Sequence, residues 1–322
     1  MRSSWIHGCL LAALLLAGTP AQGQTQTDWP TAPVRVVVPF PPGGANDMVA
    51  RPYADALSQM LKQPFVVENR GGAGGTVGLE SVLRAPPDGY TFCMCASTVI
   101  STVANLRKVS FTAKDVDPVA MTTIYLSGLL TGPKMPATSF EEFIRYAKAN
   151  PGKVIYGSSG VGSPTELRMK YLGVLAGIEM VHVPYNGNAQ GLVDLLAGSI
   201  DAIVELNGFP HVKTGKLRML AFFGDERHPD FPDVPTMAEV GYPTVNTPIW
   251  QGFYAPPGIP QPIREKMNRA VADISARPAM QQKLLAMGLL TRSMPLDELR
   301  AFYLADDAAN KKIIREANIR ID

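Results

Sequence analysis

Two glycine-rich turns in this 322-residue sequence contain residue types that can bind a small anion. Each turn follows an apolar run typical of a buried strand and precedes a helix-like pattern. Glycine lets the backbone approach a ligand closely, and the first N–H groups of a helix have no partner within it. Such turns bind anions without lysine or arginine. The candidate groups are the backbone at Gly43 and Gly44 in PFPPGGAND, and the hydroxyls of Ser158, Ser159 and Ser163 in GSSGVGSPTE.

A nucleotide is not the ligand that these spacings indicate. The run GGAGGTVG, residues 71–78, lacks the G-x-G-x-x-G spacing because Val77 stands where the third glycine should follow Gly72 and Gly74. No G-x-x-x-x-G-K-[ST] pattern occurs anywhere in the chain. The run is interpreted as a tight turn with close packing of a helix on a sheet.

The sequence offers little for catalysis or for a metal. His182, His211 and His228 show neither an H-E-x-x-H pattern nor i, i+4 spacing, and GSSGVGS lacks G-x-S-x-G. His182 is expected to be a strand residue with a satisfied ring. Asp47 and Glu166 could form a carboxylate pair, but an N-cap role for Asn46 or Asp47 is the commoner use of such residues. We expect no catalytic residue, no metal and no cofactor; a periplasmic hydrolase or isomerase is the remote alternative.

The elements that carry the first turn alternate as in a doubly wound α/β fold. Three runs are typical of strands, and helical patterns separate them. Pro52 is expected in the first turn of its helix, where a missing N–H costs little. The expected strands are 34–38, 65–68 and 90–95, and the expected helices are roughly 47–61 and 75–84.

A second set of such elements begins near Ser139, which forms a capping-box pattern with Glu142. The expected strands are 154–156, 180–183, 202–205 and 218–222, with helices at 139–149, 165–175 and 189–197. The C-terminal third has helical patterns at 261–275, 279–287 and 296–316. Both glycine-rich turns then lie at the carboxyl ends of parallel strands, where open α/β sheets bind ligands.

Two extended stretches, 121–130 and 250–255, are candidate crossings between two domains. Two crossings make the first domain discontinuous. We therefore expect residues 24–122 with 250–322 to form one domain, and residues 123–249 to be inserted as the second. Each domain should hold a mainly parallel sheet flanked by helices.

Composition and the N-terminus indicate a secreted protein. Arg2, the apolar run 9–18 and the small residues before position 24 are typical of a signal peptide covering residues 1–23. The formal net charge of +2, with scattered basic residues, argues against nucleic acid. Cys93 and Cys95 lie two apart in a strand, which disfavours a mutual disulfide, and are interpreted as small buried hydrophobes. We expect the mature chain to be a secreted monomer.

Seven motifs, in order along the chain, resemble the substrate-binding proteins of tripartite tricarboxylate transporters, the Bug family. The resemblance covers roughly residues 29–315, and the ordered set is far more specific than any single motif. The motifs are VRVVVPFPPGGANDMVAR, VVENRGGAGGTVG, PPDGYTF, GSSGVGS, HVPYNG, FPDVPTMAEVGYP and APPGIP.

The resemblance implies a location in the periplasm and a two-domain clamshell of the type II periplasmic binding protein kind, which delivers a small carboxylate to a membrane permease. In the family the two turns meet across the cleft and hold a ligand carboxylate through N–H groups, hydroxyls and bridging waters. The positions that carry over are Phe40, Gly43, Gly44 and Asp47 on one side, Ser158, Ser159, Gly162 and Ser163 on the other, Ser97 and Thr98 after the third strand, and Tyr185.

The chain departs from the family pattern at three places. Glu166 stands where the family commonly has histidine, so it would disfavour a second negative group or pair with a ligand ammonium. The segment after Val204 is shorter than usual, with Glu205 near the usual aspartate, and Cys93 and Cys95 replace aliphatic residues. The ligand, a small carboxylate or an amino acid, therefore stays open. So does the alternative of a ligand-dependent sensor that presents its closed form to a receptor kinase.

Overall fold

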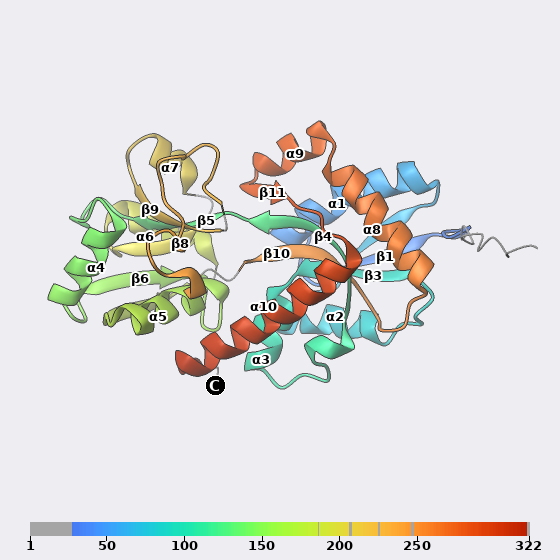
Figure 1. Cartoon of the computed structure of the whole chain (residues 1–322), viewed down its shortest axis with the longest axis horizontal. Coiled ribbons are helices and arrows are strands. Elements are labelled where there is room, and N and C mark those ends of the chain that lie inside the picture. Colours follow the sequence, from blue (N-terminus) through green and yellow to red (C-terminus); the bar gives the residue numbers. More distant parts are fainter. Residues whose placement is uncertain (1–27, 186, 206–207, 225, 246–247, 321–322) are drawn as a thin grey trace, which may run out of the picture.

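The computed structural model describes residues 28–320 except 186, 206–207, 225 and 246–247. The expected signal peptide, residues 1–23, lies outside the described residues. Figure 1 shows two groups of strands and helices side by side, with the C-terminal helix α10 running from one group toward the other. None of the described helices is long and apolar enough to cross a membrane.

The first sheet has six strands in the order β11-β4-β10-β3-β1-β2. Strand β1 pairs in parallel with β2 and β3, whereas β10 is antiparallel to β3 and β4, and β11 is antiparallel to β4. The strands are β1 Val34–Val38, β2 Phe65–Asn69, β3 Thr91–Ala96, β4 Asp117–Tyr125, β10 Trp250–Ala255 and β11 Leu289–Thr291.

The second sheet has five strands in the order β7-β6-β8-β5-β9. Strand β6 is parallel to β7 and β8, and β5 is antiparallel to β8 and β9. The strands are β5 Ser127–Thr131, β6 Val154–Ser158, β7 Met180–Pro184, β8 Ala202–Glu205 and β9 Arg218–Phe223.

The expected α/β fold of two helix-flanked sheets is confirmed. Most strands of each sheet run in one direction, as expected, while β10 and β11 in the first sheet and β5 in the second run against them. Of the reversed strands, β11 follows α9 in the same half of the molecule, whereas β5 and β10 arrive from the other sheet. Such a strand enters at the edge where its parallel neighbours end, so it has to run against them. The stretch expected to be a crossing at 250–255 is therefore an internal strand of the first sheet.

The expected helices are present with bounds shifted by a few residues. They are α1 Ala45–Leu61, α2 Thr76–Leu83, α4 Phe140–Ala149, α5 Pro164–Ala176, α6 Asn188–Ala197, α8 Gln261–Ser275, α9 Pro278–Leu285 and α10 Leu296–Glu316. Helix α3 Ala104–Leu106, helix α7 Phe209–Lys213, a π-helical turn at Val99–Val103 and strand β11 were not expected. Their short lengths leave too little periodicity to detect.

Two expectations about the first helix are wrong. Helix α1 begins at Ala45 with Gly44 as its N-cap, so Pro52 is its eighth residue and lies inside the helix. Proline there removes one intrahelical hydrogen bond, which the packing of the buried residues around it offsets. Asn46 and Asp47 occupy the second and third helical positions, and neither is the N-cap.

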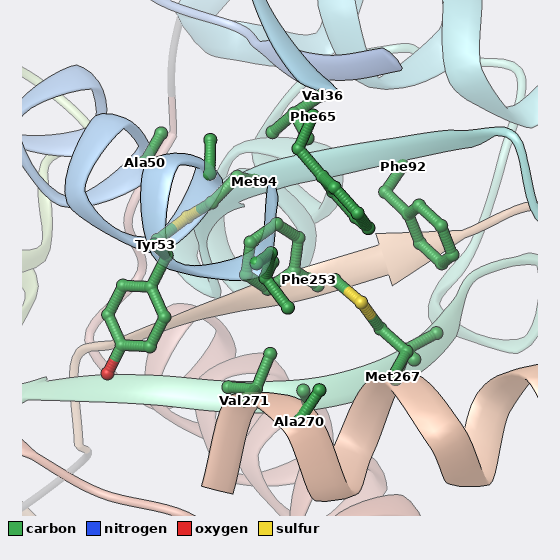
Figure 2. Close-up of a cluster of buried hydrophobic side chains, with 14 of the residues drawn as sticks. Val36, Ala50, Tyr53, Phe65, Phe92, Met94, Phe253, Met267, Ala270 and Val271 are labelled. Carbon is green, nitrogen blue, oxygen red and sulfur yellow. The ribbon is translucent and has the colours of Figure 1, made fainter. Parts of the chain in front are cut away.

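Buried side chains cover both faces of the first sheet. Figure 2 shows Tyr53 of α1, Phe253 of β10 and Met267 of α8 meeting on one face. Along β3, Phe92 and Met94 point to this face, while Cys93 and Cys95 point to the other, as the alternation of a strand requires. Both cysteines are buried and free, which confirms their interpretation as small buried hydrophobes.

Helix α10 packs against both sheets. Leu299 and Tyr303 lie in a core cluster of the first sheet, whereas Ile313 lies in the core of the second. The hydroxyl of Tyr171 in α5 donates to Glu316 near the end of α10 at 2.9 Å. The C-terminal helix therefore stabilises the arrangement of the two halves in addition to the two connecting segments.

Candidate ligand-binding site

The order of the strands places both glycine-rich turns at facing edges of the two sheets. Strand β4 runs in the same direction as β1 and continues through Leu126 alone into β5. The carboxyl ends of β1 and β3 therefore lie at the edge of the first sheet that faces the second. Because β5 starts at the facing edge and runs against β8, the carboxyl ends of β6 and β8 face the first sheet in turn.

The first turn is built around a buried carboxylate. Asp47, which is 3% exposed, accepts a bond from the backbone N–H of Gly43 at 2.9 Å. The guanidinium of Arg51, one helical turn later, donates to both carboxylate oxygens at 2.9 Å. Asn69, at the end of the neighbouring strand β2, donates to Asp47 at 2.9 Å and to the carbonyl of Phe40 at 3.1 Å.

These partners set the charge of Asp47. Burial acts to raise its pKa, but the bonds from Arg51, Gly43 and Asn69 outweigh burial, so the pKa lies below its usual value of 3.8. Asp47 is therefore an ionised, fully engaged carboxylate at neutral pH. Its place in the first turn of α1 also lets it interact favourably with the helix dipole.

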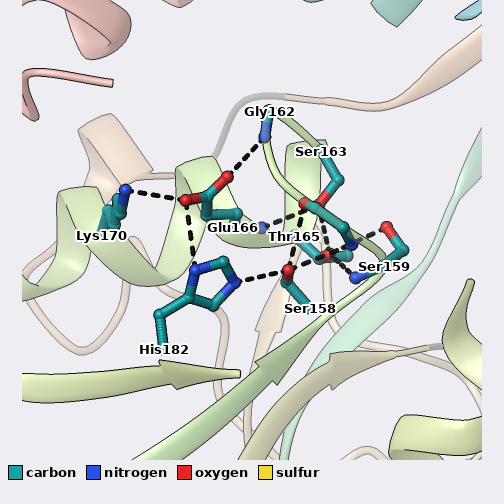
Figure 3. A network of polar contacts seen from close by, with 9 residues as sticks. Ser158, Ser159, Gly162, Ser163, Thr165, Glu166, Lys170 and His182 are labelled. Carbon is teal, nitrogen blue, oxygen red and sulfur yellow. Dashed lines mark hydrogen bonds and ion pairs between the residues drawn. The ribbon is translucent and has the colours of Figure 1, made fainter. Parts of the chain in front are cut away.

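The second turn repeats this construction (Figure 3). Glu166, which is 1% exposed, accepts a bond from the backbone N–H of Gly162 at 2.5 Å. Lys170, one helical turn later, lies 2.7 Å from the Glu166 carboxylate. His182, on the neighbouring strand β7, places Nδ1 3.3 Å from the same carboxylate.

The backbone conformations of the two turns are also similar. Gly43 and Gly162 have φ values of 78° and 75°, a region that glycine enters without strain. Each is followed by an extended N-cap residue, and the carboxylate is the third residue of each helix. In sequence the shared pattern is glycine, three residues, an acid, three residues and a base.

The two helix starts differ in their caps. Gly44, the N-cap of α1, supplies no side-chain hydrogen bond. Ser163, the N-cap of α5, accepts from the N–H of Glu166 at 3.3 Å, and Pro164 at the first helical position has no N–H. The first turn therefore leaves more helix-start N–H groups for an anion than the second turn does.

The serine hydroxyls of the second turn have partners within the turn and its neighbours. Ser158 Oγ lies 2.7 Å from Nε2 of His182, and Ser159 and Ser163 each place Oγ 3.1 Å from the hydroxyl of Thr165. Figure 3 shows these contacts as one network. The expectation that the ring of His182 is satisfied is confirmed.

Ser158, His182 and Glu166 have the order of contacts found in a nucleophilic triad. Ser158 is fully buried, however, and the N–H of Gly160 donates to its hydroxyl at 3.2 Å. A buried, hydrogen-bonded hydroxyl is not accessible for attack on a substrate, so the contacts stabilise the turn. Among residues 28–320, apart from the excepted positions, no group of three or more acidic, histidine or cysteine side chains could hold a metal ion.

The other sequence-predicted site residues lie around the same two edges. Ser97, buried after β3, donates its N–H to the carbonyl of Trp250 at 2.8 Å, and the half-buried Thr98 follows it. Tyr185, after β7, donates its hydroxyl to Asp194 at 2.8 Å and its N–H to the carbonyl of Ser158 at 3.0 Å.

Two further predicted residues complete this placement. Glu205 is buried at the end of β8, opposite Gly128. Phe40 is half-buried, and its ring lies against Gly75, where an added Cβ would meet it at 3.1 Å. Every predicted site residue thus lies at or next to the facing edge of its own sheet.

Sequence reasoning missed four residues that complete the turns: Arg51, Asn69, Thr165 and Lys170. The i, i+4 spacing of acid and base could have indicated Arg51 and Lys170, because such pairs meet on a helix. Asn69 has no comparable local signal, since it is brought to Asp47 by the pairing of β2 with β1.

The two helix-flanked sheets and their facing turns define the class of protein. Chains of this architecture include solved periplasmic binding proteins. One is the Rhodopseudomonas palustris protein Rpa4515 with adipate, at a TM-score of 0.76 and 32% identity, covering 91% of this chain and 99% of that one. Another is MatC of the same organism with bound malate, at a TM-score of 0.68 and 32% identity, covering 90% and 99%.

Sequence comparison identifies the family. The family model described as tripartite tricarboxylate transporter family receptor matches residues 49–319. Protein BugT of Bordetella pertussis is 32% identical over 312 residues, covering 95% of each chain. The chain belongs to the tripartite tricarboxylate transporter receptor family, and the resemblance seen in the seven motifs is confirmed. Members of this family are solute-binding receptors rather than enzymes.

Proposed function

We propose that this protein captures a small organic carboxylate between its two halves and delivers it to the membrane subunits of a tripartite tricarboxylate-type transporter. The observation that carries the proposal is the placement of two glycine-rich turns at facing sheet edges. The uncapped start of α1 offers N–H groups to an anion without a basic side chain. The similar chains bound to adipate and malate support a carboxylate as the ligand class.

The proposal includes the domain division and the location expected from the sequence. Residues 24–122 with 250–322 form one domain, residues 123–249 form the other, and the two close on the ligand by a hinge at the connecting segments. Residues 1–23 direct the chain to the periplasm, where it acts as a monomer and performs no chemistry of its own.

Ligand-dependent thermal stability tests the proposal. A ligand that binds only the folded state adds RT ln(1 + [L]/Kd) to stability, about 2.7 kcal/mol at a hundredfold excess over Kd. We expect adipate, malate or another carboxylate of a broad panel to raise the melting temperature, with one ligand bound per chain. The absence of any shift across carboxylates and amino acids would contradict it.

Delivery requires a separate test in cells. Deletion of the gene should reduce uptake of the stabilising carboxylate, because the permease then lacks its receptor. Unchanged uptake with lost transcriptional induction by that compound would instead identify a sensor.

A further inference from the structure

We propose that Asp47 and Glu166 are positioning residues: each fixes the backbone of its glycine-rich turn and neither contacts the ligand. For its consequences on binding, this inference rests on the proposed function. It replaces the expectation that both carboxylates contact the ligand directly. It also gives Arg51 and Lys170 a role, which is to neutralise these carboxylates next to an anion site.

The hydrogen bonds of Asp47 leave it no capacity for a ligand. A carboxylate offers about four lone-pair positions. Four donors occupy them: Oδ1 accepts from Arg51 Nη2 and Asn69 Nδ2, and Oδ2 accepts from Gly43 N and Arg51 Nε. With 3% of the residue exposed, no further donor reaches it without displacing one of these.

Glu166 is engaged in a similar way. Its Oε1 lies near both Lys170 Nζ and His182 Nδ1, at 2.7 and 3.3 Å, and Oε2 accepts from Gly162 N. Only 1% of the residue is exposed. A ligand ammonium, which the sequence had suggested as a partner of Glu166, would therefore have to replace Lys170 or His182.

Holding the glycine N–H determines which backbone N–H groups of the turn remain available to a ligand. With the N–H groups of Gly43 and Gly162 held by carboxylates, neither is a donor for the ligand. The N-cap residue that follows each glycine is extended, so each helix leaves its turn in a defined direction. The N–H groups of Ala45 and Asn46, at the uncapped start of α1, are then the groups that an anion can use.

Charge neutralisation follows from the same geometry. An unpaired carboxylate in the first turn of a helix would oppose the binding of an anionic ligand there. Arg51 is half-exposed, with 51% of its side chain accessible, yet it donates two bonds to Asp47. Replacing Arg51 should weaken binding of a carboxylate although Arg51 itself does not bind the ligand.

The test compares two substitutions at each position with a matched control. Asp47→Ala and Glu166→Ala remove the acceptor, whereas Asp47→Asn and Glu166→Gln keep an amide oxygen that can accept from glycine. The control is Glu142→Ala: Glu142 is also the third residue of a helix, α4, and accepts from the N–H four residues earlier, that of Thr138, at 2.8 Å. It does not belong to either glycine-rich turn.

The first measurement needs no ligand. Amide hydrogen exchange of the intact protein should show the Gly43 N–H exchanging about tenfold faster or more in Asp47→Ala, and the Gly162 N–H likewise in Glu166→Ala. The amide-bearing variants should retain most of the protection, and Glu142→Ala should change neither glycine. Unchanged glycine exchange in the alanine variants would overturn the proposal.

The second measurement uses adipate and malate as probes in calorimetric titrations. In the alanine variants the affinity for the probe should fall by about tenfold or more. Much of that affinity should be recovered in Asp47→Asn and Glu166→Gln. If the amide variants lose binding as fully as the alanine variants while glycine exchange stays protected, the carboxylates contact the ligand and the proposal is wrong. If the wild-type protein binds neither probe, the choice of carboxylate is at fault, and the exchange experiment still decides the positioning role.

Discussion

The hydroxyl of Ser158 lies 2.7 Å from Nε2 of His182, and Nδ1 of the same ring lies 3.3 Å from the Glu166 carboxylate. A carboxylate only accepts hydrogen bonds, so the proton of a neutral ring sits on Nδ1 and Nε2 accepts from Ser158. The carbonyl of Gly160, 3.1 Å from the Ser158 hydroxyl, is a second acceptor for its proton within the turn. Strand β7, helix α5 and the turn after β6 are joined through this one imidazole.

The first prediction is energetic coupling between Ser158 and His182. Ser158→Ala should lower the free energy of unfolding by about 1–3 kcal/mol, because it leaves a half-buried ring nitrogen without its donor. Urea unfolding of Ser158→Ala, His182→Phe and the double variant should give a coupling energy of about 0.5–3 kcal/mol. Additive effects of the two substitutions would show that the contact contributes nothing to stability.

The second prediction concerns pH. Burial lowers the pKa of His182; the Glu166 carboxylate opposes this effect, and Lys170 adds to it. A histidine whose folded pKa lies below its unfolded value of about 6.5 contributes stability above that value and loses it as pH falls through the folded pKa. Urea unfolding between pH 7.5 and pH 5 should show a smaller loss of stability in His182→Gln than in the wild type. Parallel pH profiles would contradict the prediction.

The third prediction concerns Asp306 in α10, which accepts from the indole of Trp250 at 3.2 Å and from Asn310 at 2.9 Å. Burial raises its pKa to about 7. A raised pKa gives stability that is fully present below the unfolded value of about 3.9 and is lost as pH rises through 7. The wild type should therefore lose stability between pH 4 and pH 8 that Asp306→Asn keeps. The difference in unfolding free energy between the variant and the wild type should shift by about 2–4 kcal/mol in favour of the variant over this range.

Denaturant unfolding at both pH values measures this difference. Trp250→Phe serves as a companion variant: it removes one donor to Asp306, so the pH at which stability declines should rise further. An Asp306→Asn protein whose stability relative to the wild type is independent of pH would show that Asp306 titrates normally.

The fourth prediction separates the two glycines of the first turn. An added Cβ at Gly43 meets nothing within 4 Å, but its φ of 78° is unfavourable for other residues, so Gly43→Ala should cost about 1–2 kcal/mol of stability. At Gly44 the Cβ would meet the carbonyl oxygen of Pro41 at 3.3 Å and stand at the start of α1. Gly44→Val should therefore abolish probe binding with a smaller loss of stability.

Thermal melting with and without adipate or malate measures both effects. Gly258→Ala is the matched control, because Gly258 also has a positive φ, 93°, with nothing within 4 Å, and lies in neither turn. It should lose stability like Gly43→Ala and keep full binding. Full affinity in Gly44→Val would move the site away from the first turn.

Local sequence determined much of this protein. Valine runs gave the strands, glycine pairs gave the turns, and the Ser163 cap with Pro164 behind it begins α5, because each of these features acts within a few residues. The ordered motifs also carried enough information to indicate the family, which the family model confirms.

Only the tertiary structure decided how the turns are completed. Asn69 reaches Asp47 across 22 residues of sequence because β2 pairs beside β1, and His182 reaches Glu166 because β7 pairs beside β6. The reversed directions of β5 and β10 likewise depend on which sheet each strand arrives from. Strand pairing is a long-range choice made by burial of whole sheet faces, and a local pattern of residue types does not contain it.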